Sequence, residues 1–189
     1  YSHFEEILPA SARRRMFYLK GGPGVGKSTL MRRVGGAAEK AGLEVEYFHC
    51  SSDPDSLDAV CLPQKGAALM DGTAPHVYDP VAPGARDTLV SLGDFLDEAA
   101  LRSHTDEILR LQAAISGRFR RCYCYLGGAR KVWEAACPGR EDPRKACELA
   151  AEWADSLPLR GGAGSLRRLF GAAYTPRGYV DLVPRMELK

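Results

Sequence analysis

The strongest constraint on the fold of this 189-residue chain is a Gly-x-x-x-x-Gly-Lys-Ser pattern at residues 21–28. An apolar, aromatic-rich segment precedes it at residues 15–20 and predicts a buried strand. Residues 27–41 carry apolar side chains at helical spacing up to Gly42, which predicts a helix. A strand, a glycine-rich turn and a helix in this order are the context in which the pattern forms a phosphate-binding loop, or P-loop.

Each residue type in the pattern suits a triphosphate. Glycines let the backbone curl around an anion with its N–H groups inward, and the helix N-terminus adds positive partial charge. Lys27 is expected to reach the β- and γ-phosphates and to act in catalysis, while Ser28 ligates Mg²⁺. The predicted nucleotide-binding residues are Gly22, Pro23, Gly24, Val25, Gly26, Lys27, Ser28 and Thr29. The guanine-reading pattern Asn-Lys-x-Asp is absent from the sequence, so ATP is favoured over GTP.

Two further segments predict strands of the same sheet. Residues 43–48 alternate between apolar and polar, and residues 67–70 form a short apolar run. Residues 72–84 hold three prolines and two glycines, which excludes regular structure there. The order strand, helix, strand, loop, strand predicts an α/β fold of the P-loop NTPase type, with a parallel sheet in a three-layer α/β/α arrangement.

Asp71 follows the strand expected at residues 67–70. An acidic residue at the carboxyl end of a strand beside a P-loop is placed to bind Mg²⁺ through water, so Asp71 is the second predicted metal ligand after Ser28. The alternative is an aspartate that only caps a helix or a turn.

Polar residues at the end of the strand 43–48 are candidates for catalysis. Asp53 can orient the attacking water or accept a proton from an alcohol, although Ser-x-Asp-Pro sequences also form turns unaided. Asp55 is a weaker candidate, and His49 fits equally a partly buried, hydrogen-bonded histidine. His76 is expected near the γ-phosphate, with loop packing as its alternative role.

The second half of the chain changes character near Leu101. An apolar stripe at spacings of three and four runs to Trp133 and predicts one long helix, which ends at residues 138–139. A second helix is expected over residues 143–156, with Asp142 as its N-cap. The pair predicts an antiparallel helical hairpin that serves packing or acts as a lid or a partner-binding arm. A lid would offer one of its arginines to the triphosphate, and the alternative is that the arginines form a solvated helix face. These arginines are Arg118, Arg120, Arg121 and Arg130.

Composition places the chain among globular proteins and gives no sign of nucleic-acid or membrane binding. Lys and Arg total 26 against 24 Asp and Glu, and no apolar run approaches the length of a membrane span. The first residues lack the apolar core of a signal peptide, so a cytoplasmic location is expected. The spacing of the six cysteines matches no zinc pattern, and reduced thiols are the simplest interpretation.

Several segments together resemble a bacterial family of predicted ATPases whose members contain two P-loop halves in tandem. The resemblance is specific over residues 4–110 and rests on residues 20–31, 47–58, 71–76 and 80–85 and on the Leu-Gly-Asp-Phe segment near residue 92. Residues 168–181 resemble the opening of a second half. We therefore expect a nucleotide-binding core at residues 1–100 and a helical hairpin at 101–160, and the resemblance implies that residues 161–189 are a linker and the start of a second half. It also implies that the chain is truncated and that its partner is a second P-loop half or another copy.

Three functions remain open from the sequence. The first is a Mg²⁺-dependent ATPase that couples hydrolysis to a conformational change. The second is a P-loop kinase that passes the γ-phosphate to a small metabolite or nucleotide, with Asp53 and Asp55 at the acceptor hydroxyl. The third is a nucleotide-responsive binding module without useful catalysis. The ATPase ranks first because no residue specifies an acceptor.

Overall fold

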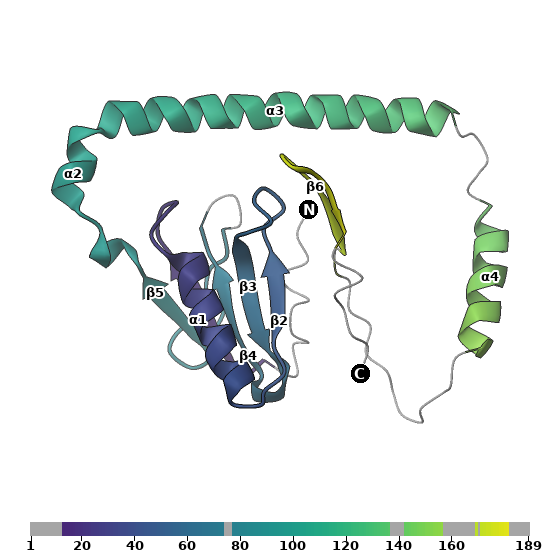
Figure 1. Cartoon of the computed structure of the whole chain (residues 1–189), viewed down its shortest axis with the longest axis horizontal. Helices are drawn as coiled ribbons and strands as arrows, with labels where there is room; N and C mark the ends of the chain where they lie inside the picture. The colour runs from purple at the N-terminus through teal and green to yellow at the C-terminus, as the bar shows by residue number, and fades with distance from the viewer. Residues whose placement is uncertain (1–12, 74–76, 137–141, 157–168, 170, 182–189) are drawn as a thin grey trace. The chain divides into compact units, whose positions relative to one another are not determined.

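The computed structural model describes residues 13–73, 77–136, 142–156, 169 and 171–181, and the chain has a mixed α/β fold (Figure 1). It divides into two units. The first comprises Tyr1–Leu96 and Ser165–Lys189, and the second comprises Asp97–Gly164. The candidate site lies in the first unit.

A five-stranded sheet forms the centre of the first unit. In spatial order its strands are β2 (Glu46–His49), β3 (Leu57–Leu62), β4 (Ala67–Asp71), β1 (Arg15–Lys20) and β5 (Asp87–Ser91). Strand β1 pairs in parallel with both β4 and β5, and the register places Leu19 opposite Asp71. The end of the strand that precedes the glycine-rich loop therefore lies directly beside the end of the strand that carries Asp71.

The prediction of a wholly parallel sheet is wrong, because β3 is antiparallel to both of its neighbours, β2 and β4. Only residues 63–66 separate β3 from β4, and a parallel pair needs a crossover of about a dozen residues or more. Since two reversals restore direction, β2 runs the same way as β4 and β1. The carboxyl ends of β1, β2, β4 and β5 therefore share one edge of the sheet.

The expected count of three strands is also wrong, because β3 and β5 were not predicted. The expected strand at residues 43–48 forms as β2 at 46–49, and the strand at 67–70 extends to Asp71. Two 3₁₀ turns, Pro63–Lys65 and Gly93–Phe95, follow β3 and β5.

The helix predicted after the glycine-rich loop is confirmed as α1 (Lys27–Lys40), and Met31 is the fully buried residue of its apolar side. It packs against β3 and one face of the sheet, where Met31 joins Leu19, Leu57, Val60 and Leu69 in one core cluster. The opposite face of the sheet buries a second cluster, whose members are Met16, Tyr18, Ala59, Cys61, Ala68 and Met70. Two apolar faces thus hold the sheet rigid beneath its carboxyl edge.

The second unit is helical in its described part, with α2 (Glu98–Ser103), α3 (Thr105–Ala136) and α4 (Pro143–Ser156). The two predicted helices are confirmed as α3 and α4. The expected apolar stripe is present on α3, where Ile115, Leu126 and Trp133 are all exposed. Leu149 and Trp153 of α4 are also exposed, so the packed hairpin stays a prediction.

A short β-hairpin, β6 (Ala172–Thr175) and β7 (Gly178–Asp181), belongs to the first unit. The sequence Thr-Pro-Arg-Gly at residues 175–178 predicts a turn, and this turn joins the two strands, with Tyr174 packed against Tyr179 across the hairpin. The sequence also predicts a short strand at residues 166–170, which lies almost wholly outside the described residues. The resemblance of this segment to the start of a second half stays a prediction.

Candidate functional site

The glycine-rich loop, residues 21–26, joins β1 to α1 at the carboxyl edge of the sheet. Gly24 and Gly26 have φ angles of 81° and 92°, a left-handed region that side chains with a Cβ avoid. An added Cβ at either position would meet no atom within 4 Å, so the loop is open above both glycines. Gly26 is the N-cap of α1, and no described side chain caps this end of the helix. Its N–H groups therefore remain available to an anion.

Lys27 folds back over the glycine-rich loop. Its ammonium donates to the carbonyl oxygens of Gly21 at 2.7 Å and Gly22 at 2.9 Å. The same nitrogen lies 3.6 Å from Oδ2 of Asp71. The structure thus brings together the predicted phosphate-binding lysine and the predicted metal-binding carboxylate, from α1 and the end of β4.

The Asp71 carboxylate is held by the residue two positions later. Its Oδ1 accepts a hydrogen bond from the backbone N–H of Thr73 at 2.9 Å and a second, short one from the Thr73 hydroxyl. This is the turn geometry that the alternative interpretation of Asp71 foresaw. It occupies Oδ1 only, so Oδ2, on the side of Lys27, remains open to a cation.

Ser28 connects α1 to the start of β3. Its hydroxyl oxygen accepts a hydrogen bond from the N–H of Leu57 at 3.0 Å. A serine oxygen has two lone pairs, so this bond leaves one for a metal. Ser28 therefore couples the glycine-rich loop to the loop that ends at β3.

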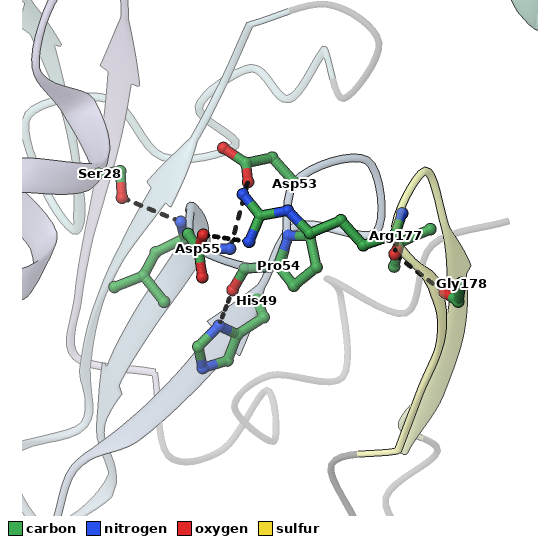
Figure 2. Close-up of polar contacts among 9 residues, drawn as sticks. Ser28, His49, Asp53, Pro54, Asp55, Arg177 and Gly178 are labelled. Carbon is green, nitrogen blue, oxygen red and sulfur yellow. Dashed lines mark hydrogen bonds and ion pairs between the residues drawn. The ribbon is translucent and has the colours of Figure 1, made fainter.

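That loop, residues 50–56, carries the carboxylates Asp53 and Asp55. Asp53 forms a turn, because its side chain accepts from the N–H of Asp55 at 3.3 Å and its carbonyl accepts from Ser56 at 2.8 Å. The guanidinium of Arg177, from the β6–β7 turn, pairs with Asp55 and lies 3.8 Å from Asp53 (Figure 2). Both carboxylates are exposed and share one cation, although Arg177 was not a sequence candidate.

The contacts of His49 and Cys50 indicate structural roles. The Nδ1 atom of His49 lies 2.7 Å from the carbonyl oxygen of Pro54, which matches the interpretation of a partly buried, hydrogen-bonded histidine (Figure 2). Burial raises the pKa of the Cys50 thiol, and the negative charge of Asp58 raises it further. A raised pKa disfavours the thiolate, which is the nucleophilic form of cysteine.

The structure does not test the remaining sequence candidates as residues of this site. His76 lies outside the described residues, and its role stays a prediction. Arg118, Arg120 and Arg121 are exposed on α3 in the second unit, and Arg130 donates to Glu134 of the same helix at 2.6 Å. The lid role of these arginines also stays a prediction.

Lys20 is a second basic residue at this edge that was not predicted. It ends β1, and its ammonium donates to the carbonyl oxygens of Gly72 at 2.7 Å and Tyr78 at 2.9 Å and to Asp79 at 3.2 Å. A lysine as the last residue of a buried strand, directly before the first glycine, was the only signal in the sequence.

The donor set limits the kind of metal site. Within the described part of the chain, no three His, Cys, Asp or Glu side chains gather closely enough to hold a metal ion. One hydroxyl and one carboxylate, Ser28 and Asp71, do fit Mg²⁺, which keeps several waters and takes other ligands from phosphates. The pair fits a metal that arrives with a nucleotide.

Comparisons with protein-family models, curated proteins and solved structures found no match to this chain. None of the described helices is both long and apolar enough to cross a membrane.

Proposed function

We propose that this protein is a P-loop NTPase that binds Mg-ATP and hydrolyses it, with hydrolysis coupled to a conformational change. The observation that carries the proposal is the convergence of Lys27 and Asp71 over the open glycine-rich loop. A lysine ammonium, a carboxylate and the uncapped N-terminus of α1 meet at one edge. This combination suits a polyphosphate with its cation.

Each residue has a separate role in the proposal. Lys27 exchanges the carbonyl oxygens of Gly21 and Gly22 for β- and γ-phosphate oxygens, which are charged and bind an ammonium more strongly. The backbone N–H groups at the start of α1 hold the phosphates, and Thr29 contacts the α-phosphate. Ser28 and Asp71 hold Mg²⁺, which neutralises charge on the β- and γ-phosphates. Asp53 or His76 orients the attacking water.

The hydrogen bond between Ser28 and Leu57 supplies a route for the conformational change. Leu57 follows directly after the loop 50–56, whose end it fixes beside the glycine-rich loop. If Ser28 held Mg²⁺, its oxygen would share its lone pairs between the metal and the Leu57 N–H, which would couple metal binding to the loop. The proposed ligand site and the Asp53–Asp55 loop are thus joined by one side chain.

A small-molecule kinase is the second candidate. The observation that favours it is that Asp53 and Asp55, from the same edge as the glycine-rich loop, pair with one guanidinium. Two carboxylates so placed suit an acceptor with hydroxyl or cationic groups. Such an acceptor has to displace Arg177.

Isothermal titration calorimetry with Mg-ATP tests nucleotide binding. We expect Lys27→Ala to lower the binding free energy by about 1.5–3 kcal/mol, because charge-assisted hydrogen bonds to phosphate are lost. Lys40→Ala, at the exposed far end of α1, is the matched control and should bind like the wild type. Equal affinities of Lys27→Ala and the wild type would contradict the proposal.

Product assays separate the functions. Release of ADP and phosphate without any acceptor supports the ATPase, and ADP release that requires an added metabolite supports the kinase. Tight binding with neither product points to the nucleotide-responsive module.

A further inference from the structure

We propose that Lys20 is a positioning residue that orients the Asp71 carboxylate through the peptide group between Gly72 and Thr73. The inference rests on the proposed function of this same site, because it assigns Lys20 to the metal-binding carboxylate. Lys20 belongs neither to the glycine-rich pattern nor to the acidic end of β4, so it is an additional residue of the proposed site.

The chain of contacts begins at the Lys20 ammonium. A lysine ammonium has three protons, and the described residues supply three acceptors: the carbonyl oxygens of Gly72 and Tyr78 and the carboxylate of Asp79. The Asp79 carboxylate is 80% exposed and the Lys20 side chain 30% exposed. The two carbonyl bonds are therefore the sheltered part of the arrangement, and they fasten both ends of the segment 72–78 to β1.

The peptide group between Gly72 and Thr73 links Lys20 to Asp71. Its carbonyl oxygen, that of Gly72, accepts from Lys20 at 2.7 Å, and its N–H, that of Thr73, donates to Oδ1 of Asp71 at 2.9 Å. Because a peptide group is planar, fixing the direction of its oxygen fixes the direction of its N–H. A cation on the oxygen also polarises the group and strengthens the bond that its N–H donates.

Gly72 is the residue that lets Lys20 reach this carbonyl. It is buried, and an added Cβ would stand 3.2 Å from Cε of Lys20 and 3.4 Å from Nζ. The backbone N–H of Gly72 also donates to the carbonyl oxygen of Leu19 at 3.0 Å. The lysine stem thus crosses the backbone of Gly72 at a point that β1 already holds in place.

The two oxygens of the Asp71 carboxylate therefore have different partners. Oδ1 of Asp71 is held by Thr73, while Oδ2 lies 3.6 Å from the Lys27 ammonium. Lys20 fixes the first, so the second keeps a constant direction toward the proposed metal. Residues behind a metal ligand that orient it in this way contribute about 10–100-fold to metal affinity.

The first test needs no nucleotide. Amide hydrogen exchange of Thr73, followed by NMR on the unliganded protein, reports the bond from its N–H to Asp71. We expect Lys20→Met to lower protection of this amide about five- to ten-fold, the loss of roughly one hydrogen bond. Asp79→Asn is the matched control, because it removes an exposed partner of the same ammonium and leaves the Gly72 carbonyl bond intact.

A second variant separates geometry from charge. Gly72→Ala keeps the lysine but pushes its stem away from the peptide group, so it should lower Thr73 protection as Lys20→Met does. It also provides the test if Lys20→Met does not fold. Unchanged Thr73 protection in a folded variant of either kind would overturn the inference.

The second test measures Mg²⁺ affinity at saturating ATP and, separately, ATP affinity in EDTA. Lys20→Met should weaken Mg²⁺ about ten-fold and change ATP affinity in EDTA less than two-fold. Equal losses in both would show that Lys20 acts as a phosphate-binding charge, which overturns the positioning role. A wild-type protein that binds no ATP would instead refute the proposed function, while the Thr73 measurement still reports on the orientation of Asp71.

Discussion

The ring of Tyr47 on β2 occupies the space in which a side chain at Gly35 of α1 would stand. An added Cβ at Gly35 would lie 2.6 Å from Cζ of Tyr47 and closer still to its hydroxyl oxygen. The neighbouring Gly36 has no atom within 4 Å of the same position. Two consecutive glycines of one helix therefore have opposite surroundings, and of these two only Gly35 faces the sheet.

We expect Gly35→Ala to lower the free energy of unfolding by about 1–2 kcal/mol, because overpacking exceeds the gain in helix propensity. Gly36→Ala should raise it by about 0.5–1 kcal/mol, since only the propensity gain remains. Urea unfolding of both variants measures the difference. Tyr47→Val should remove the penalty at Gly35, and a stabilising Gly35→Ala in the wild-type background would show that α1 does not pack as described.

An ion pair between the buried Asp87 and the partly exposed Arg86 anchors the start of β5. Asp87 is 1% exposed and accepts from Nε of Arg86 at 2.5 Å and from the N–H groups of Val81 and Ala82 at 2.7 and 2.8 Å. The hydrogen bond from Arg86 holds the pKa of Asp87 far below its usual range, although burial alone would raise it. A depressed pKa in the folded state stabilises the protein above the unfolded pKa of about 4, and this contribution is lost as pH falls below that value.

Asp87→Asn should therefore cost about 2–4 kcal/mol at pH 7, because it breaks this pair and leaves one N–H without its charged acceptor. The difference between wild type and variant should shrink as the pH is lowered from 5 toward 2. Urea titrations at several pH values measure it, with the exposed Asp94→Asn as control. A difference that is constant over this range would refute the titration of Asp87 as its cause.

Asp71→Asn tests the metal ligand directly. The substitution keeps an acceptor for Thr73 but removes the charge that faces Lys27 and the proposed Mg²⁺. We expect the gain in nucleotide affinity that Mg²⁺ provides to fall about ten-fold or more. The nucleotide affinity measured in EDTA should change little. Equal effects with and without Mg²⁺ in calorimetry would remove Asp71 from the metal role.

The pair between Arg177 and Asp55 is exposed on both sides, with side chains 63% and 70% accessible. Water and salt screen such a pair, so Arg177→Glu should shift the urea midpoint less than Asp87→Asn does. The two variants can be compared in one experiment at low salt. A larger shift for Arg177→Glu would contradict the small contribution expected of this exposed pair.

Local patterns allowed the glycine-rich loop, α1 and the two long helices to be predicted from the sequence. Glycine spacing and 3.6-residue periodicity are properties of neighbouring residues and need no knowledge of the rest of the fold. Strand β3 was missed because Asp58 interrupts its apolar run just after a polar loop. The antiparallel direction of β3 was therefore not predicted either, although the four-residue connection to β4 permits only an antiparallel pair.

The residues of the candidate site also divide into those that a local pattern marks and those that it does not. Lys27, Ser28 and Asp71 were predicted because a motif or a strand end marks each of them. The contacts of Lys20 with Gly72 and of Arg177 with Asp55 join residues 52 and 122 positions apart. No spacing rule reaches across such separations, since they depend on which strands become neighbours.

The place of β1 between β4 and β5 determines the order in which the sheet can assemble. Strands β2, β3 and β4 form a meander with short connections. Closing these short loops costs little conformational entropy, so the meander can form early. Strand β1 finds its partners only after β4 and β5 have been synthesised, since they follow it in the chain. We expect its insertion to be the late, rate-limiting step of folding, so that the glycine-rich loop reaches its final conformation only when the sheet is complete.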